Sequence, residues 1–190
     1  MQIIIKEEFG LQKDAIVEEI GEGAIFIHPT DTIYGIGGSA LLNDIAKEIR
    51  NIKKSYKQPF SVIAPSKQWI RENCIVPKEA VEWLVKLPGP YTLIFKRKKQ
   101  NCVAEQVAPG LNTLGVRIPK HWFSRAVEEM GFPVITTSAN ITNNDFMTSL
   151  ENLDVEIKKK LDFIIYEGEK KGRPSKIIDF TKEKTEIKER

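Results

Sequence analysis

A short polar run, TTSAN at residues 136–140, is the stretch whose residue types could most readily do chemistry. It directly follows the apolar, β-prone residues 132–135, so we expect it where a buried strand leaves a sheet. Ligands of α/β proteins bind just beyond the carboxyl ends of strands. Thr136, Ser138 and Asn140 would offer short hydrogen-bonding groups there. The same residue types also favour helix N-caps and turns, which leaves a purely structural role open.

Three other stretches place Pro, Gly or hydroxyl residues beside an apolar run in the same way. They are HPTDTIYG at residues 28–35, LPGPYT at 87–92 and LGVRIP at 114–119. Arg117 in the last of these stands between Val116 and Ile118, although a strand-end arginine can also simply face solvent. The repetition of one pattern favours a functional role for the polar run at 136–140.

Common catalytic and cofactor motifs do not occur in the sequence. Both the GxGxxG and the GxxxxGK[ST] phosphate fingerprints are missing, and GIGG at residues 35–38 is not followed by the lysine of a phosphate loop. His28 precedes a proline in a turn and His121 opens a predicted helix, so we expect structural roles for both. Cys74 and Cys102 form no CxxC pair, which argues against a structural zinc site.

The helices that would position these stretches show apolar residues at helical spacing. Asn43 and Ser66 are candidate N-caps, and Gly131 is the expected C-terminal stop of one helix. The helix that begins at residue 77 is expected to turn Ala80, Val81, Leu84 and Val85 inward. The predicted helices cover residues 12–20, 43–55, 66–70, 77–87, 122–130 and 150–160.

Short apolar or alternating runs between these helices predict about eight strands. Several of them are joined by short turns, which argues against a purely parallel sheet. The sequence therefore predicts one α/β domain with a mixed sheet. The predicted strands cover residues 24–27, 59–63, 91–95, 113–118, 132–135, 163–166, 176–180 and 186–189.

The composition is that of an ordinary globular protein. The chain has 190 residues, 41% hydrophobic and 29% charged, with a formal net charge of +3. No apolar run approaches the roughly 20 residues that span a bilayer, and residues 1–7 do not resemble a secretory signal. Together with two unpaired cysteines, this suggests the cytoplasm and no membrane partner. Lysine clusters at residues 53–54, 96–99, 158–160 and 170–171 are typical of solvated faces, or of a polyanion-binding cleft if they share one.

The four polar stretches, in this order, resemble the YrdC/YciO family from about residue 25 to residue 179. Well-characterised members make threonylcarbamoyl-adenylate from L-threonine, bicarbonate and ATP, and this product feeds tRNA modification. The resemblance implies a single YrdC-like domain over residues 1–190, with a twisted mixed sheet flanked by helices and an open basic cleft. It also implies Mg²⁺ carried with ATP, downstream tRNA threonylcarbamoyl transferase proteins, and no additional C-terminal domain.

The resemblance also implies the residues that bind each substrate. No dedicated catalytic residue is expected, because Lys53, Lys54 and Arg117 would act by positioning the substrates. Arg117 would hold the threonine carboxylate, a task that suits a bidentate guanidinium. The implied L-threonine ligands are Thr32, Arg117, Thr136 and Ser175. The implied ATP ligands are Lys53, Lys54, Gln58, Thr113, Ser138, Asn140 and Arg190.

The sequence departs from the family pattern in three places. Residues 52–59 carry adjacent lysines where the family has lysine, any residue and arginine, so Lys53 and Lys54 either take the two cationic roles or form only the basic last turn of a helix. Lysine lacks the planar fork of arginine, which predicts weaker phosphate binding. Residues 141–145 replace a usual Ser-Gly, and Asn143 could keep the turn because Asn tolerates positive φ. Lys176 replaces the usual threonine after Ser175.

Two other functions remain open from the sequence. The lysine-rich departure is compatible with a divergent YciO-like module that binds RNA, including tRNA, or a nucleotide without making the adenylate. A different carbamoyl or acyl transfer on the same scaffold is the second alternative, because a fold does not fix a function.

Overall fold

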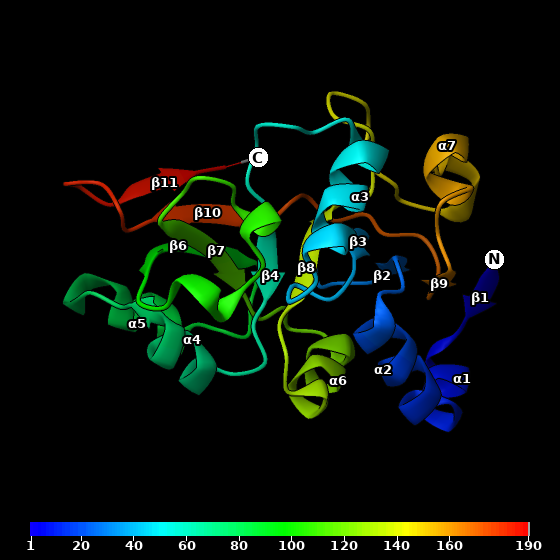
Figure 1. Cartoon of the computed structure of the whole chain (residues 1–190), viewed down its shortest axis with the longest axis horizontal. Helices are drawn as coiled ribbons and strands as arrows, with labels where there is room; N and C mark the ends of the chain where they lie inside the picture. Colours follow the sequence, from blue (N-terminus) through cyan, green and yellow to red (C-terminus); the bar gives the residue numbers. More distant parts are fainter. Residues whose placement is uncertain (190) are drawn as a thin grey trace.

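A ladder of β-strands runs through the protein from β1 (Gln2–Ile4) at one edge to β11 (Glu186–Lys188) at the other (Figure 1). The computed structural model describes residues 1–189. Within them the strand order is β1-β9-β2-β3-β8-β4-β7-β6-β10-β11, and β5 pairs with β6. The remaining strands are β2 (Phe26–His28), β3 (Gly35–Gly37), β4 (Ser61–Ile63), β5 (Cys74–Ile75), β6 (Tyr91–Arg97), β7 (Thr113–Arg117), β8 (Val134–Ser138), β9 (Phe163–Ile165) and β10 (Lys176–Asp179).

Parallel and antiparallel pairs are mixed along this ladder, which confirms the predicted mixed sheet. β4 runs parallel to β7, whereas β8 runs antiparallel to both of its neighbours, β3 and β4. The described residues form eleven strands rather than about eight. The additional strands are β1, β3 and β5, which have only two or three residues each and are too short for alternation to reveal.

Seven α-helices pack around this ladder in the described part of the chain. Two predicted helix ends are confirmed: Ser66 accepts a 2.9 Å hydrogen bond from the Trp69 amide, and Gly131 closes α6 at φ 75°. The helices are α1 (Lys6–Leu11), α2 (Lys13–Glu22), α3 (Asn43–Lys53), α4 (Lys67–Asn73), α5 (Val81–Val85), α6 (Trp122–Met130) and α7 (Val155–Lys158).

Other helix predictions were wrong. Asn43 begins α3 instead of capping it, because its Oδ1 accepts a 3.0 Å hydrogen bond from the amide of Gln106. The helix predicted from residue 77 is a 3-10 turn followed by α5; Ala80 and Leu84 are buried as predicted, but Val81 and Val85 are exposed. The helix predicted over 150–160 is reduced to a 3-10 turn and α7, because Asp154 caps a new helical start.

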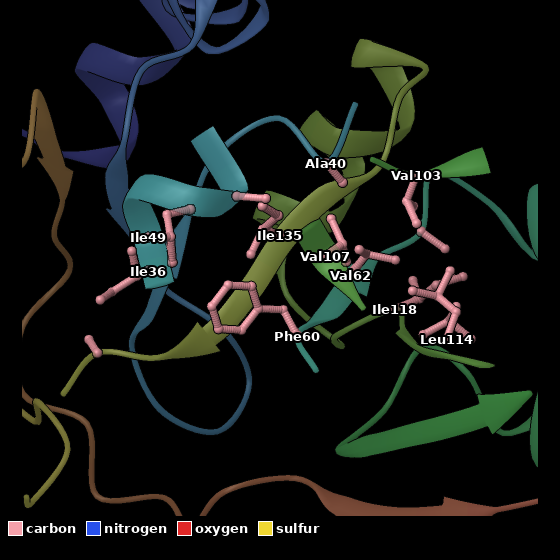
Figure 2. Packing of buried hydrophobic residues seen from close by; sticks show 14 of the residues in the cluster. Ile36, Ala40, Ile49, Phe60, Val62, Val103, Val107, Leu114, Ile118 and Ile135 are labelled. Carbon is pink, nitrogen blue, oxygen red and sulfur yellow. The ribbon is translucent and has the colours of Figure 1, made fainter. Parts of the chain in front are cut away.

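Buried apolar residues form two clusters on opposite sides of the sheet. Figure 2 shows part of the larger cluster, in which Ile135 and Val62 of the central strands pack with Ile49 of α3. The smaller cluster joins α1, α2 and α6 to Ile63 and Val134. Since adjacent residues of a strand point to opposite sides, Val62 and Ile63 assign the two clusters to the two faces of the sheet.

The register of the central strands makes part of the second face polar. Ser61 pairs with both Thr136 and Gly115, and residues paired across neighbouring strands point to the same side. Along each of these strands, every second residue therefore points to this same side of the sheet. We call this side the site face; its polar and glycine positions are Gly35, Ser61, Thr113, Gly115, Arg117, Thr136 and Ser138.

Arg50 of α3 fixes the loop that follows the helix. Its guanidinium is buried and donates to the carbonyls of Gln106 at 2.8 Å, Ser55 at 2.9 Å, Gln58 at 2.7 Å and Val107 at 3.2 Å. It also lies 4.4 Å from the centre of the Phe60 ring. These contacts order residues 55–58, which lead into β4 and the site face.

We expect Arg50→Ala to lower the free energy of unfolding by about 3 kcal/mol or more, because several hydrogen bonds to a charged donor are lost at once. Urea unfolding would measure this change. The matched control is Arg125→Ala, since the Arg125 side chain is 84% exposed and its ion pair with Glu129 should contribute little. Equal midpoints for the two variants would contradict the structural role of Arg50.

Candidate functional site

A cavity of about 290 Å³ opens on the site face. The sheet register brings its walls together from segments that are far apart in the sequence. Seven of the eleven residues predicted to bind substrate line it: Lys53, Gln58, Arg117, Thr136, Ser138, Asn140 and Ser175. The other lining residues are Thr30, Ile33, Tyr34, Gly35, Ser55, Pro59, Phe60, Ser61, Thr92, Thr137, Thr142, Asn143, Phe146 and Pro174.

Lys53 occupies one end of the cavity. Lys53 is only 4% exposed. Its ammonium donates to the Ser138 carbonyl at 2.5 Å, to the Asn140 carbonyl at 2.7 Å and to Asn140 Oδ1 at 3.2 Å. Burial lowers the pKa of Lys53 to about 8, because desolvation disfavours the charged form. Lys53 is therefore an inward-facing cation whose charge can change slightly above neutral pH.

The turn after β8 is built around this lysine. Ser138 Oγ donates to Asn140 Oδ1 at 2.5 Å, and Asn140 Nδ2 donates to the Asn144 carbonyl at 2.7 Å. Both the amide and the hydroxyl of Thr142 donate to the Lys53 carbonyl at 2.9 Å. Asn143 has φ 73°, which confirms the prediction that this asparagine adopts a positive φ in the turn.

Arg117 lies toward the opposite end, where β7 finishes. The residue is 6% exposed, so the alternative of a solvated strand-end arginine is wrong. Its Nη2 donates to Asp31 Oδ1 at 2.9 Å and to Thr32 Oγ1 at 3.2 Å. Asp31 Oδ2 also accepts from the Lys120 amide at 2.8 Å, which fixes the carboxylate that orients the guanidinium. The result is a buried cation held by a neighbouring carboxylate.

Hydroxyl groups surround the Arg117 end. Ser175 Oγ lies 2.7 Å from Thr92 Oγ1, and both residues are buried. Thr30 Oγ1 lies 2.9 Å from Thr32 Oγ1 and donates to the Ile33 carbonyl at 2.7 Å. A cation ringed by short hydroxyl side chains is well suited to a small, polar, carboxylate-bearing ligand.

Three other predicted site residues, Thr32, Lys54 and Thr113, lie outside the cavity lining. Thr32 reaches the cavity only through its contacts with Arg117 and Thr30, and its own surface borders an adjacent hollow. Lys54 is exposed in a left-handed conformation, φ 51°, just beyond α3. Thr113 lies on the site face at the start of β7, without lining the cavity. Arg190 lies outside the described residues.

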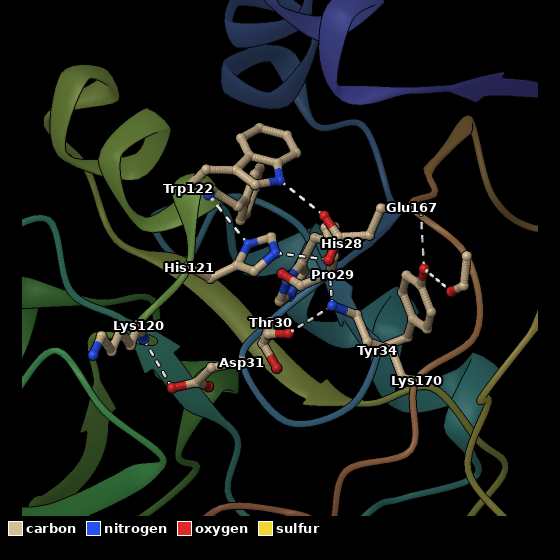
Figure 3. A network of polar contacts seen from close by, with 12 residues as sticks. His28, Pro29, Thr30, Asp31, Tyr34, Lys120, His121, Trp122, Glu167 and Lys170 are labelled. Atoms are coloured by element: carbon tan, nitrogen blue, oxygen red, sulfur yellow. Dashed lines mark hydrogen bonds and ion pairs between the residues drawn. The ribbon is translucent and has the colours of Figure 1, made fainter.

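Both histidines have structural surroundings, as expected. His28 is fully buried and stacks on Phe123 with a centroid distance of 5.1 Å, and burial lowers its pKa to about 3. His121 caps α6, because its Nδ1 accepts a 3.3 Å hydrogen bond from the Phe123 amide (Figure 3). Cys74 and Cys102 are buried free thiols, and burial raises the pKa of Cys74 to about 12.

Residues 1–189 hold no group of three or more His, Cys, Asp or Glu side chains able to bind a metal ion. No helix within this part of the chain is long and apolar enough to cross a bilayer.

Several residues of the site were not predicted. Ser61 and Thr92 line the cavity, and Asp31 orients Arg117. A Cβ on Gly115 would lie 2.6 Å from Ser61 Oγ, so this glycine makes room for the serine. The every-second-residue spacing of Thr113, Gly115 and Arg117 is the signal that could have shown the polar side of β7.

Comparisons with known proteins give matches over most of the chain. The Sua5/YciO/YrdC family model, described as "Telomere recombination", matches residues 18–190. A Methanocaldococcus jannaschii protein named "Putative threonylcarbamoyl-AMP synthase" is 35% identical over 170 residues, which cover 88% of this chain and 79% of that protein.

Two further comparisons involve Pyrococcus abyssi. Its threonylcarbamoyl-AMP synthase is 33% identical over 168 residues, so the match covers 85% of this chain and 48% of the relative. The crystal structure of P. abyssi Sua5 complexed with L-threonine gives a TM-score of 0.86 at 27% identity, covering 98% of this chain and 56% of that chain. The present chain thus spans only about half the length of the Pyrococcus protein.

The family match over most of the chain, the shared fold and the four ordered polar stretches lead to one conclusion: the chain belongs to the Sua5/YciO/YrdC family.

Proposed function

We propose that this protein is an L-threonylcarbamoyladenylate synthase, which makes threonylcarbamoyl-AMP and pyrophosphate from L-threonine, bicarbonate and ATP. The observation that carries the proposal is one cavity with a buried arginine toward one end, a buried lysine at the other and hydroxyl groups between them. The names of the relatives and the L-threonine complex of the P. abyssi protein support the same reading.

The proposed chemistry needs no nucleophile from the protein. The threonine amine attacks bicarbonate, and loss of water gives a carbamate. A carbamate oxygen then attacks the α-phosphorus of ATP, and the bond to pyrophosphate breaks. Because the attacking and leaving groups both belong to substrates, the protein would act by orienting them and by offsetting negative charge.

Arg117 would hold the threonine carboxylate. Asp31 keeps the guanidinium in place by accepting a hydrogen bond from Nη2. Thr32, Thr136 and Ser175 would supply hydroxyl contacts around the bound amino acid. This assignment places the amine toward the middle of the cavity.

Lys53 would face the phosphates, with Ser138, Asn140, Gln58 and Thr113 as further ATP contacts. The three acceptors that now hold its ammonium all belong to the turn after β8, so this cation and that turn would bind the phosphates as one unit. The exposed Lys54 would contribute long-range attraction. Arg190 stays a sequence-based prediction.

The magnesium ion is proposed to arrive on the ATP phosphates. Residues 1–189 contain no carboxylate cluster that fits a resident ion, so no step is assigned to it. The product is a mixed anhydride, and its proposed consumer is an acyl-transfer system that modifies tRNA. Direct RNA contact also stays a prediction; the inward position of Lys53 favours a small ligand over a polyanion bound at the surface.

The direct test is release of pyrophosphate in the presence of ATP, L-threonine and bicarbonate. We expect release to require all three, and to fall to background when threonine is replaced by an amine without a carboxylate. Release that continues with another amine acceptor would indicate a different transferase. No release under saturating conditions would overturn the proposal.

Lys53 also predicts a pH dependence. Its pKa of about 8 means that the ammonium is present below pH 8 and is lost above it, so ATP affinity should fall as pH rises. Deprotonation of this single ammonium should weaken the apparent affinity for ATP roughly eightfold between pH 7.5 and pH 9. Titration of ATP into the wild type, Lys53→Met and Lys54→Met would measure this, with the exposed Lys54 as the matched control.

We expect the pH dependence to vanish in Lys53→Met and to persist in Lys54→Met. The same profile in wild type and Lys53→Met would show that Lys53 does not contact the phosphates.

A further inference from the structure

The connection between β9 and β10, residues 166–175, carries a polar cluster that the proposed reaction does not use. At its centre lies the carboxylate of Glu167 (Figure 3). Its Oε1 is 2.8 Å from His121 Nε2, and its Oε2 accepts from Trp122 Nε1 at 2.9 Å. Lys170 donates to the same Oε1. One carboxylate therefore joins the start of α6 to the β9–β10 connection.

This cluster is partly shielded from water. The side chains of His121, Lys170 and Glu167 are 11%, 17% and 24% exposed. Since His121 Nδ1 accepts from the Phe123 amide, its Nε2 carries the proton and donates to Glu167. Burial by itself would raise the pKa of Glu167, but the hydrogen bonds from Lys170, Trp122 and His121 hold it below its ordinary value. The carboxylate is thus charged and fully engaged.

Tyr34 connects the cluster to the wall of the cavity. Its hydroxyl accepts from the Glu167 amide at 3.1 Å and donates to the Gly168 carbonyl at 2.7 Å. Its ring stacks on that of Tyr166, with 5.6 Å between the ring centroids, and Tyr34 is one of the residues that line the cavity. The start of the β9–β10 connection is therefore fastened to a cavity residue.

Lys170 connects the cluster to the turn that holds Thr32. Its ammonium donates to the Thr30 carbonyl at 3.0 Å. Thr30 in turn accepts from the Thr32 amide at 3.1 Å, and Thr32 Oγ1 accepts from Arg117. Three consecutive hydrogen bonds thus lead from Lys170 to the guanidinium.

The end of the β9–β10 connection also lies against the turn that holds Thr32. A Cβ on Gly172 would lie 2.2 Å from the Thr32 carbonyl oxygen, so the two backbones are in direct contact. Pro174 and Ser175 follow and line the cavity. The connection is therefore fixed by Glu167 and Lys170 at its start and forms part of the Arg117 end of the site at its finish.

We infer that Glu167 and Lys170 act as a clamp whose task is to position the amino-acid half of the cavity. They are positioning residues: Lys170 holds the turn of residues 30–32, Glu167 holds Lys170, and both hold the connection that delivers Ser175. The inference rests on the proposed function, since it assigns the clamp to the threonine end. Lys53 and Asn140, at the proposed nucleotide end, are held by a separate set of bonds.

The test is titration of L-threonine and of ATP, separately, into the wild type, Glu167→Gln and Glu169→Gln. Glu169 is the matched control, because it lies two residues away and its 3.9 Å contact with Lys171 is exposed. We expect Glu167→Gln to weaken threonine binding about tenfold, since a charge-assisted bond to Lys170 is lost, while ATP binding changes less than twofold. Glu169→Gln should bind both ligands like the wild type.

A second pair of variants separates positioning from general loss of structure. Lys170→Met should weaken threonine binding as Glu167→Gln does, and Lys170→Arg should restore most of it by keeping a cation near Glu167 and Thr30. Threonine binding by Glu167→Gln at wild-type strength, or equal weakening of both ligands, would overturn the clamp. Failure of the wild type to bind threonine would instead count against the proposed function.

Discussion

The register of β8 between β3 and β4 is the constraint on which the site depends. It sets Thr136 beside Ser61 and Ser138 beside Gly35, so that hydroxyl groups from separate segments meet on one side of the sheet. A slip of one residue would turn these groups toward the apolar core and turn Ile135 toward the cavity. The apolar cluster around Ile135 and Val62 therefore fixes the position of the polar groups as well as stabilising the fold.

Three buried cationic side chains in this region, Arg50, Lys53 and Arg117, have different roles. Arg50 donates only to carbonyls and fixes the loop before β4, whereas Lys53 and Arg117 line the cavity. A buried charge needs hydrogen-bonding or oppositely charged partners. Arg117 is paired with the carboxylate of Asp31, whereas Lys53 donates to backbone and side-chain amide oxygens. The ammonium of Lys53 has no carboxylate among its three acceptors, which is consistent with its lowered pKa.

The sequence was enough to predict a mixed α/β sheet, the helix of residues 122–130 and the gathering of four polar stretches. Asn143 could be predicted from the tolerance of asparagine for positive φ, and the inward position of Arg117 from its apolar neighbours. The strands β1, β3 and β5 could not be predicted, because two or three residues without a longer apolar run are too few for alternation to show. The roles of Asp31 and Glu167 could not be predicted either, because they arise only from contacts with residues 86 and 46 positions away.

Isothermal titration of L-threonine can establish whether its carboxylate binds at Arg117. The informative comparison is between the wild type and the double variant Asp31→Asn with Arg117→Gln, which removes both partners of the buried ion pair and leaves no unpaired charge. We expect the wild type to bind L-threonine, and the double variant to lose at least tenfold in affinity for it while still binding ATP. Equal threonine affinity in the two proteins would contradict the assignment of the carboxylate to Arg117.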